Sequence, residues 1–223
     1  MTVSHVHLEA HGVALVLEFD GAGLPSVLHW GAPLGAVGAA DLEQLSRALS
    51  RQRAGATLDA SWQVPIFAAE ADGWSGRPGL QVRTAAGILR PRWRVTRVDA
   101  ADAAVTVEAN DESSGLGLTW IAAIESGGLV WLDARLQAGA ESIEVDWLEP
   151  TLPVPTTTTH LTTFDGRWTR EKRPVTTSVP AGAVARQTRR GRPGHDAPTV
   201  AVLSIGAPRW GAGAVWGVHA AWS

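Results

Sequence analysis

Residues 116–124, with the sequence Leu-Gly-Leu-Thr-Trp-Ile-Ala-Ala-Ile, decide the fold class of this 223-residue chain. They are apolar at almost every position. Such a run is typical of a central strand covered on both faces, or of one sheet stacked on another. Two packed sheets satisfy both arrangements, so the segment predicts a β-sandwich with residues 116–124 near its centre.

Nine further runs of the same kind lie on both sides of this segment. They are rich in Val, Leu, Ile and Trp and end at Gly, Pro, Asp or Asn, which is typical of strands. The pattern predicts an all-β fold. The predicted strands are 13–19, 24–30, 93–98, 104–109, 116–124, 129–136, 143–148, 156–163, 200–204 and 214–222.

Residues 143–148 show the alternation of a half-buried strand. Ile143, Val145 and Trp147 fall on one face, because successive side chains of a strand point to opposite sides. Glu144 and Asp146 fall on the other face. We therefore expect the apolar face to pack inward and the acidic face to meet water.

One segment, residues 41–53, has the spacing of a helix. Asp41 can cap its first turn, leucines recur every three or four residues, and arginines gather toward its end. The pattern predicts one short surface helix inserted among the strands. The leucines are Leu42, Leu45 and Leu49, and the arginines are Arg47, Arg51 and Arg53.

The composition limits the function classes. A net charge of −3 and a pI near 6.2 argue against nucleic acid as the main partner, since such proteins carry a basic excess. The chain has no cysteine, which excludes disulfides, thiolate catalysis and cysteine-ligated zinc. No signal sequence or membrane-spanning stretch is visible, so we expect a cytoplasmic protein with one domain over residues 1–223.

Acidic residues occur in two sets close enough in sequence to suggest chemistry. One is Asp146 with Glu149, and the other is Asp165 with Glu171. Glycoside hydrolysis needs two carboxylates that face each other across the scissile bond. Arginines accompany the second set, however, so we expect structural ion pairs and no catalytic residues.

Metal and cofactor sites are not predicted. His5, His7 and His11 cluster near the start, but they lack the further ligands that zinc requires, and we expect them to be exposed to solvent. A glycine-rich phosphate loop and a Gly-x-Ser-x-Gly nucleophile turn are both missing from the sequence. Nucleotide binding and acyl transfer are therefore not expected either.

The tryptophans offer the best lead to a binding site. Trp74 lies in a glycine-rich turn with Asp72 and Arg77 nearby, where an exposed indole can stack on a sugar and its N–H can donate. A purely structural turn fits the same residues equally well. Four other tryptophans lie inside apolar runs and are expected in the core: Trp120, Trp131, Trp147 and Trp216.

Four segments together point to a family. They are residues 28–34 (LHWGAPL), the loop 72–80, the pair 164–171 (FDGRWTRE) and 189–195 (RRGRPGH), and residues 213–223 (GAVWGVHAAWS). In order and spacing they resemble the N-terminal domain of the bacterial α-galactosidases of glycoside hydrolase family 36. The pair carries most of the resemblance, as a structural motif of Gly166, Arg167, Trp168, Glu171, Arg190, Gly191 and Arg192.

The resemblance implies a β-supersandwich, in which two large, mainly antiparallel sheets pack face to face. In the family a (β/α)8 barrel follows and holds the two catalytic aspartates, so this chain is expected to be a non-catalytic part of a longer enzyme that cleaves α-galactosides. The implied partners are that barrel, further copies in a homo-oligomer and an α-galactoside sugar. In tetrameric relatives the loop matching 72–80 reaches a neighbour's pocket, which implies a role for Trp74, Arg77 and Asp72.

Two other functions remain open at this stage. The first is an autonomous carbohydrate-binding module that uses exposed tryptophans as platforms. The second is a sugar epimerase, since such enzymes share the supersandwich architecture and need a His and a Glu facing one pocket. His160 and Glu171 are the candidates, although their spacing does not require it.

Overall fold

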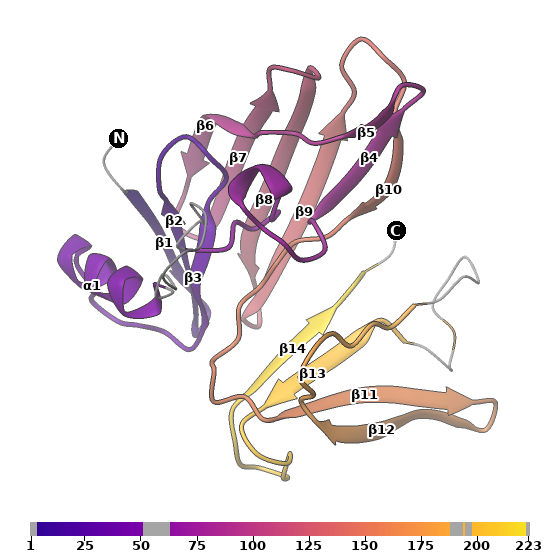
Figure 1. The fold of residues 1–223 in the computed structure, drawn as a ribbon. Helices are drawn as coiled ribbons and strands as arrows, with labels where there is room; N and C mark the ends of the chain where they lie inside the picture. The colour runs from indigo at the N-terminus through magenta and orange to yellow at the C-terminus, as the bar shows by residue number, and fades with distance from the viewer. Residues whose placement is uncertain (1–3, 51–62, 188–193, 195–197, 222–223) are drawn as a thin grey trace. The chain divides into compact units, whose positions relative to one another are not determined.

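The computed structural model describes residues 4–50, 63–187, 194 and 198–221. The chain divides into two compact units, Met1–Pro153 and Val154–Ser223. The described residues form four antiparallel sheets, one α-helix and one short 3-10 helix (Figure 1). The all-β prediction with one short helix is confirmed, and the fold is consistent with a β-sandwich. That residues 1–223 form one domain stays a prediction.

The first sheet of unit 1 has three strands, in the order β1 (Ser4–Ala10), β2 (Val13–Phe19) and β3 (Ser26–Gly31). The β1–β2 hairpin turns at His11 and Gly12, whose φ angles of 49° and 78° suit a two-residue type I′ turn. The sequence prediction lacks β1, because two histidines and a glutamate occupy every second position of the strand.

The second sheet contains β6 (Arg94–Ala100), β7 (Ala104–Asp111), β8 (Leu116–Glu125) and β9 (Leu129–Gln137) in sequential order. Burial in β8 alternates strictly: Leu116, Leu118 and Trp120 are buried, and the residues between them are half-buried. Of the two arrangements left open for residues 116–124, cover on both faces is therefore excluded, and one face of the strand packs in the core.

β2 is the strand that is covered on both faces. Leu15 and Leu17 belong to the main hydrophobic core, whereas Val16 packs with Leu28 and with Leu42 of α1 (Ala39–Leu49). The helix supplies the second cover. This explains why β2 is buried at nearly every position.

The start of α1 differs from its prediction. Gly38 is the N-cap, and the Asp41 carboxylate, one turn further on, accepts a hydrogen bond from the Gly38 backbone N–H at 2.8 Å. The prediction that Asp41 itself is the cap is wrong. Arg51 and Arg53, placed in the helix by the sequence prediction, lie outside the described residues.

The third sheet, in the order β10 (Glu144–Leu148), β4 (Leu80–Thr84) and β5 (Gly87–Leu89), carries the loop discussed below. A register shift between Val145 and Trp147 interrupts the alternation of β10, and Val145 is 48% exposed. The predicted inward face of Ile143, Val145 and Trp147 is therefore wrong at Val145. β4 and β5 are absent from the sequence prediction.

Unit 2 contains one sheet, in the order β12 (Arg170–Ser178), β11 (His160–Arg167), β13 (Val200–Ser204) and β14 (Val215–His219). β11 is shifted four residues toward the C-terminus from the predicted strand 156–163, and β14 is shorter than the predicted strand 214–222. β12 has no counterpart in the prediction, because it carries few apolar residues and all nine of its residues are exposed.

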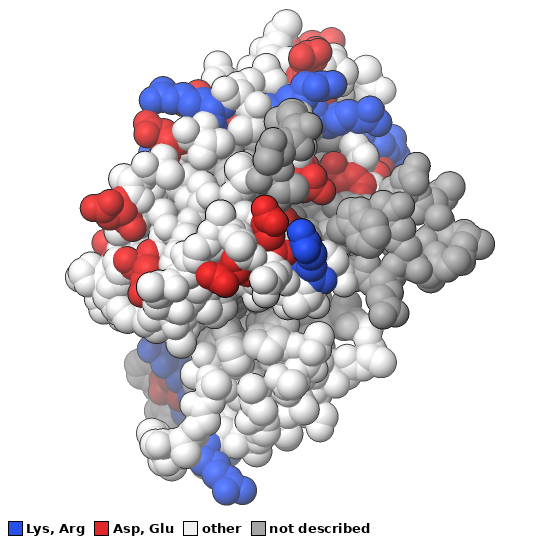
Figure 2. All heavy atoms as spheres, turned by 90° about the vertical axis from the view of Figure 1, so that its left-hand side faces the viewer, with Lys and Arg blue, Asp and Glu red and all other residues white. Residues whose placement is uncertain are grey.

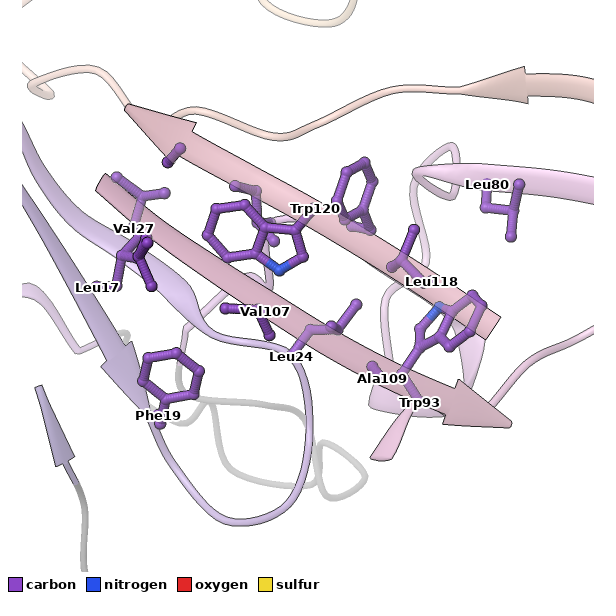
Figure 3. Close-up of a cluster of buried hydrophobic side chains, with 14 of the residues drawn as sticks. Leu17, Phe19, Leu24, Val27, Leu80, Trp93, Val107, Ala109, Leu118 and Trp120 are labelled. Atoms are coloured by element: carbon purple, nitrogen blue, oxygen red, sulfur yellow. The ribbon is translucent and has the colours of Figure 1, made fainter. Parts of the chain in front are cut away.

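The core of unit 1 joins its three sheets. Trp120 lies among side chains of the first two sheets, including Leu17, Val27 and Val107, and Leu80 and Val82 of β4 belong to the same cluster (Figure 3). Because Leu80 and Val82 are buried in this cluster, the core fixes the position of β4 and of the end of the loop that precedes it. Of the four tryptophans predicted in the core, Trp120 is buried and Trp147 and Trp216 are half-buried, but Trp131 is 44% exposed and its prediction is wrong.

Charged side chains of both signs are scattered over the face shown in Figure 2, between wide uncharged areas. Among the described residues of this face there is no basic stripe of the kind that nucleic-acid binding uses. No helix in the described ranges is long and apolar enough to cross a bilayer.

The core makes a matched prediction for two tryptophans of the same sheet. Trp120→Ala is expected to lower the free energy of unfolding by about 3–5 kcal/mol, because it leaves a large cavity. Trp131→Ala, at the half-exposed site on β9, is expected to cost less than about 1.5 kcal/mol. Urea unfolding followed by circular dichroism measures both. Equal losses in the two variants would contradict this description of the core.

Candidate functional site

The loop with Trp74 begins at the 3-10 helix η1 (Glu70–Asp72) and ends at β4. Gly73 terminates the helix with a φ of 77° and donates its N–H to the Glu70 carbonyl at 3.0 Å. This left-handed conformation favours glycine. The Trp74 N–H then bonds the Ala69 carbonyl at 3.3 Å, so the loop starts from a fixed backbone position.

Trp74 closes the loop on itself. Its indole N–H donates to the Arg77 carbonyl at 2.8 Å, and the residue is half-buried. A Cβ at Gly76 would lie 2.7 Å from two carbons of the indole, so this position fits only glycine without a shift of the ring. The expectation that the indole N–H is left to donate to a ligand is wrong.

Arg77 is held by two residues that follow or belong to β10. Its Nη2 donates to Glu149 Oε1 at 2.9 Å, and its guanidinium carbon lies 4.2 Å from the centre of the Trp147 ring. The Trp147 N–H bonds the Pro78 carbonyl at 2.8 Å. The side chain is thus oriented, yet about half of it stays exposed.

Gly79 anchors the end of the loop. Its N–H bonds the Ala68 carbonyl at 2.7 Å, and its carbonyl accepts the Glu149 N–H at 2.6 Å. A Cβ here would lie 2.9 Å from the Glu149 carbonyl oxygen and from Phe67 Cα. Because both neighbours are backbone atoms, only glycine allows this close approach.

Asp72 is the carboxyl of the loop with an altered acidity. Burial raises its pKa above the ordinary value, and a backbone hydrogen bond with Ala69 and the charge of Arg92 oppose this only in part. The protonated form is therefore favoured more in the folded chain than in water.

The space beside the loop is small. A cavity of about 60 Å³ is lined by residues that include Phe67–Glu70, Pro78 and Trp93. Pockets for small ligands measure about 300 Å³ or more, so this cavity does not enclose a sugar. Trp74 and Arg77 therefore offer a ligand an outer surface and not a closed pocket.

The acidic residues weighed as catalytic candidates are engaged in ion pairs. Asp146 pairs with Arg83 at 3.3 Å, and Glu149 pairs with Arg77 at 2.9 Å. Asp165 pairs with Arg186 at 2.6 Å, not with an arginine of its own segment. The expected pairing with an arginine is confirmed for Asp165, and the two carboxylates of the first set are paired as well.

The structural motif of the second unit is described only in its first half. Gly166 and Arg167 end β11, Trp168 lies in the turn, where it is 80% exposed, and Glu171 is the second residue of β12. The Glu171 carboxylate accepts the Thr169 backbone N–H at 3.0 Å. The motif's second half, Arg190, Gly191 and Arg192, lies outside the described residues.

The histidines do not behave as expected. The side chains of His5 and His7 are only 7% and 20% exposed, and each faces a carboxylate, Glu18 at 3.5 Å and Glu9 at 3.4 Å. The prediction of solvent exposure is wrong for both and holds for His11. Among the described residues, no group of three or more His, Asp or Glu is arranged to hold a metal ion.

His160 and Glu171 are not brought together. His160 opens β11 and pairs with Ser178 at one end of the hairpin, whereas Glu171 lies beyond the Asp165–Arg173 pair at the other end. The His160 Nδ1 lies 2.9 Å from the Thr159 hydroxyl oxygen. A single epimerase pocket cannot be built from these two side chains.

The geometry of this loop and hairpin can now be set beside known proteins. The family model "Glycosyl hydrolase family 36 N-terminal domain" matches residues 23–223. The chain belongs to this family.

Relatives of the family 36 domain are α-galactosidases. An α-galactosidase of Escherichia coli is 27% identical over an alignment of 203 residues that covers 88% of this chain and 27% of the relative. The crystal structure of family 36 α-galactosidase AgaA from Geobacillus stearothermophilus matches 96% of this chain with a TM-score of 0.79 and 19% identity. That of an α-galactosidase from Lactobacillus brevis matches 91% with a TM-score of 0.74 and 16% identity.

This family 36 domain spans about a third or less of the length of these relatives. It covers 27% of the Escherichia coli protein, 33% of AgaA and 31% of the Lactobacillus brevis protein. The two solved structures share the fold at low identity and do not by themselves assign a residue role.

Sequence reasoning missed the partners of Arg77. Glu149 and Trp147 lie about seventy residues further along the chain, and only the pairing of Leu148 with Leu80 in β10 and β4 brings them to the loop. The one local signal is the glycine-rich stretch itself, which predicts a tight turn but not its contacts.

Asp72 gives the loop a predicted pH dependence. Because its pKa is raised in the folded chain, the native state keeps the proton longer than the unfolded state as pH rises from 3.8, and the free energy of unfolding falls over that interval. Asp72→Asn is expected to remove this fall and to be at least as stable as the parent at pH 7. Urea unfolding at pH 4 and pH 7 tests this, with the exposed Asp102→Asn as control. A parent that gains stability relative to Asp72→Asn between pH 4 and pH 7 would contradict the sign.

Proposed function

We propose that this chain is the non-catalytic N-terminal domain of an α-galactosidase whose full-length form hydrolyses terminal α-galactosides of the raffinose or melibiose type. The observation that carries the proposal is the family match over residues 23–223, in a chain that spans about a third of α-galactosidase relatives. In this proposal the chain packs against a catalytic barrel, supports a homo-oligomer and works in the cytoplasm. The sugar, the barrel and further copies of the enzyme are its partners.

The ion pairing of the acidic residues supports a non-catalytic role. Retaining glycosidases need a nucleophilic carboxylate and an acid about 5 Å apart across an open site. In the described part of the chain, Asp146, Glu149 and Asp165 are each bound to an arginine. A carboxylate held in this way is stabilised as a structural anion and is a poor nucleophile.

The loop between Gly73 and Gly79 is the part that we propose to contact substrate, in the pocket of a neighbouring subunit. Arg77 uses one of its five N–H donors for Glu149 among the described residues, so it is oriented and still able to donate to a sugar hydroxyl. Trp74 would supply the exposed part of its ring. Crystal structures of AgaA variants contain raffinose and stachyose, which are sugars of the proposed class.

The non-catalytic role predicts that the purified 223-residue chain does not hydrolyse p-nitrophenyl α-galactoside above the buffer blank. Release of p-nitrophenol, measured by absorbance, checks this, and a complete family 36 α-galactosidase serves as the positive control. Hydrolysis by the chain alone at enzymatic rates, retained through a second purification step, would refute the proposal.

The loop predicts a change in substrate binding in the complete enzyme. Trp74→Ala and Arg77→Ala are each expected to raise KM for raffinose by about tenfold with a smaller change in kcat, because they remove contacts made in both the ground and transition states. Trp131→Ala, which removes a partly exposed tryptophan elsewhere in unit 1, is the matched control. If the loop is only a structural turn, the Trp74 and Arg77 variants will lose thermal stability while KM stays unchanged.

A further inference from the structure

The β11–β12 hairpin carries an irregularity close to its turn. Asp165 pairs with Arg173 and Arg167 pairs with Arg170, so one residue of β11 lies opposite two of β12. The two are Glu171 and Lys172, and Lys172 has a φ of 53°. This count is that of a β-bulge in β12.

The bulge determines which way the arginines point. In a regular strand Arg170 and Arg173, three positions apart, would face opposite sides. One extra residue between them returns them to the same side, which Arg167 and Asp165 share as their cross-strand partners. The result is a groove of about 410 Å³ lined by Asp165, Gly166, Arg167, Arg170, Arg173, Pro174 and Val175.

Among the described residues, no carboxylate neutralises the three arginines of this groove. The groove's own carboxylate, Asp165, is bound by Arg186, which also donates to the Phe164 carbonyl at 3.0 Å. Within the described ranges Arg167, Arg170 and Arg173 have no carboxylate partner. Arg92, Arg94 and Arg209 have none either, whereas six other described arginines do have one: Arg47, Arg77, Arg83, Arg90, Arg97 and Arg135.

The backbone that creates the groove is itself unfavourable. Thr169 and Lys172 have φ angles of 70° and 53°, a region that non-glycine residues avoid because Cβ approaches the carbonyl oxygen. Strain of this kind and bulges that redirect side chains are concentrated at functional positions. The backbone of the turn and the bulge therefore costs conformational free energy, and the same backbone brings like charges together.

We propose that this groove docks an acidic segment of the polypeptide that completes the enzyme. Guanidinium groups bind carboxylates through paired hydrogen bonds, and the side chain of Val175, 40% exposed, adds an apolar wall. The two cross-strand pairs that carry the arginines, Asp165–Arg173 and Arg167–Arg170, lie about 7 Å apart along the hairpin. This is the spacing of alternate side chains in an extended strand. An extended segment with acidic residues at every second position fits this spacing better than a single phosphate does.

The choice of occupant rests on the proposed function. This chain covers only 27–33% of the α-galactosidases it resembles, so most of such an enzyme is available to cover the groove. The site nevertheless lies entirely in unit 2, away from the Trp74 loop in the sequence, and can be tested without any catalytic assay.

The first test uses the 223-residue chain and a fluorescein-labelled peptide of four Glu-Thr repeats, with binding measured by fluorescence anisotropy in low salt. A triple change to Gln in the groove is expected to weaken binding at least about tenfold. A control triple change to Gln outside the groove removes the same charge and is expected to weaken it less than about threefold. The groove positions are Arg167, Arg170 and Arg173, and the control positions are Arg47, Arg97 and Arg135.

The bulge provides a second pair of variants. Insertion of one Gly after Gly166 keeps all three arginines but gives Glu171 and Lys172 one partner each, so the strands pair regularly and Arg167 and Arg170 turn to the face opposite Arg173. This variant is expected to weaken peptide binding by about tenfold. Deletion of Lys172 also removes the bulge but leaves Arg170 and Arg173 two positions apart on one face, so it is expected to bind within about threefold of the parent. Circular dichroism confirms that each variant is folded.

A third test asks what covers the groove in the complete enzyme. Trypsin is expected to cut the isolated chain after Arg167 or Arg170 at least about ten times faster than the complete enzyme, as followed by mass spectrometry. Equal cutting rates, equal weakening by the groove and control triples, or full displacement of the peptide by equimolar inorganic phosphate would each overturn the proposal. α-Galactosidase activity is measured separately, so its absence would count against the proposed function and not against the groove.

Discussion

Burial of alternate side chains of β8 against the first sheet is the constraint on which unit 1 depends. Trp120 and Leu118 are buried in the same cluster as Leu17 of β2. Leu80 and Val82 of β4 belong to this cluster too. Removal of this apolar surface from water supplies most of the driving force for folding. Because Gly79 directly precedes Leu80, the core also sets where the Trp74 loop ends, and the pairing of β4 with β10 then brings Glu149 to Arg77.

The sequence was informative where apolar runs coincide with strands and uninformative where strands are polar. β7, β8 and β9 have the alternating or continuous apolar patterns that single-sequence reasoning detects. β12 does not, since charged and polar residues hold most of its positions. β1 does alternate, with Leu8 in the core and Val6 and Ala10 packed against it, but the sequence prediction lacks it because histidines and a glutamate hold the other positions. The bulges in β10 and β12 escape detection for a related reason, because no short motif marks the position where a strand gains one residue.

The candidate loop shows the same division. Its glycines, its Trp and its Arg predict a turn that presents an aromatic and a cation, and the structure has that turn. Its contacts follow from pairing between distant strands, which no local pattern encodes: Arg77 depends on Glu149 and Trp147. The expectation that the Trp74 indole N–H can donate to a ligand failed for a similar reason. In this tight turn the Arg77 carbonyl lies within reach and accepts the hydrogen bond.

Arg77 and the groove arginines differ in what a partner would gain from them. Arg77 is neutralised by Glu149, so a ligand that approaches it meets an oriented dipole and little net charge, which suits a neutral sugar. Arg167, Arg170 and Arg173 have no such partner among the described residues, so their like charges favour an anionic ligand. The local pairing of each arginine therefore separates a surface suited to carbohydrate from one suited to acidic protein. In both places the backbone sets the outcome, through Gly76 and Gly79 in the loop and through the bulge at Lys172 in the hairpin.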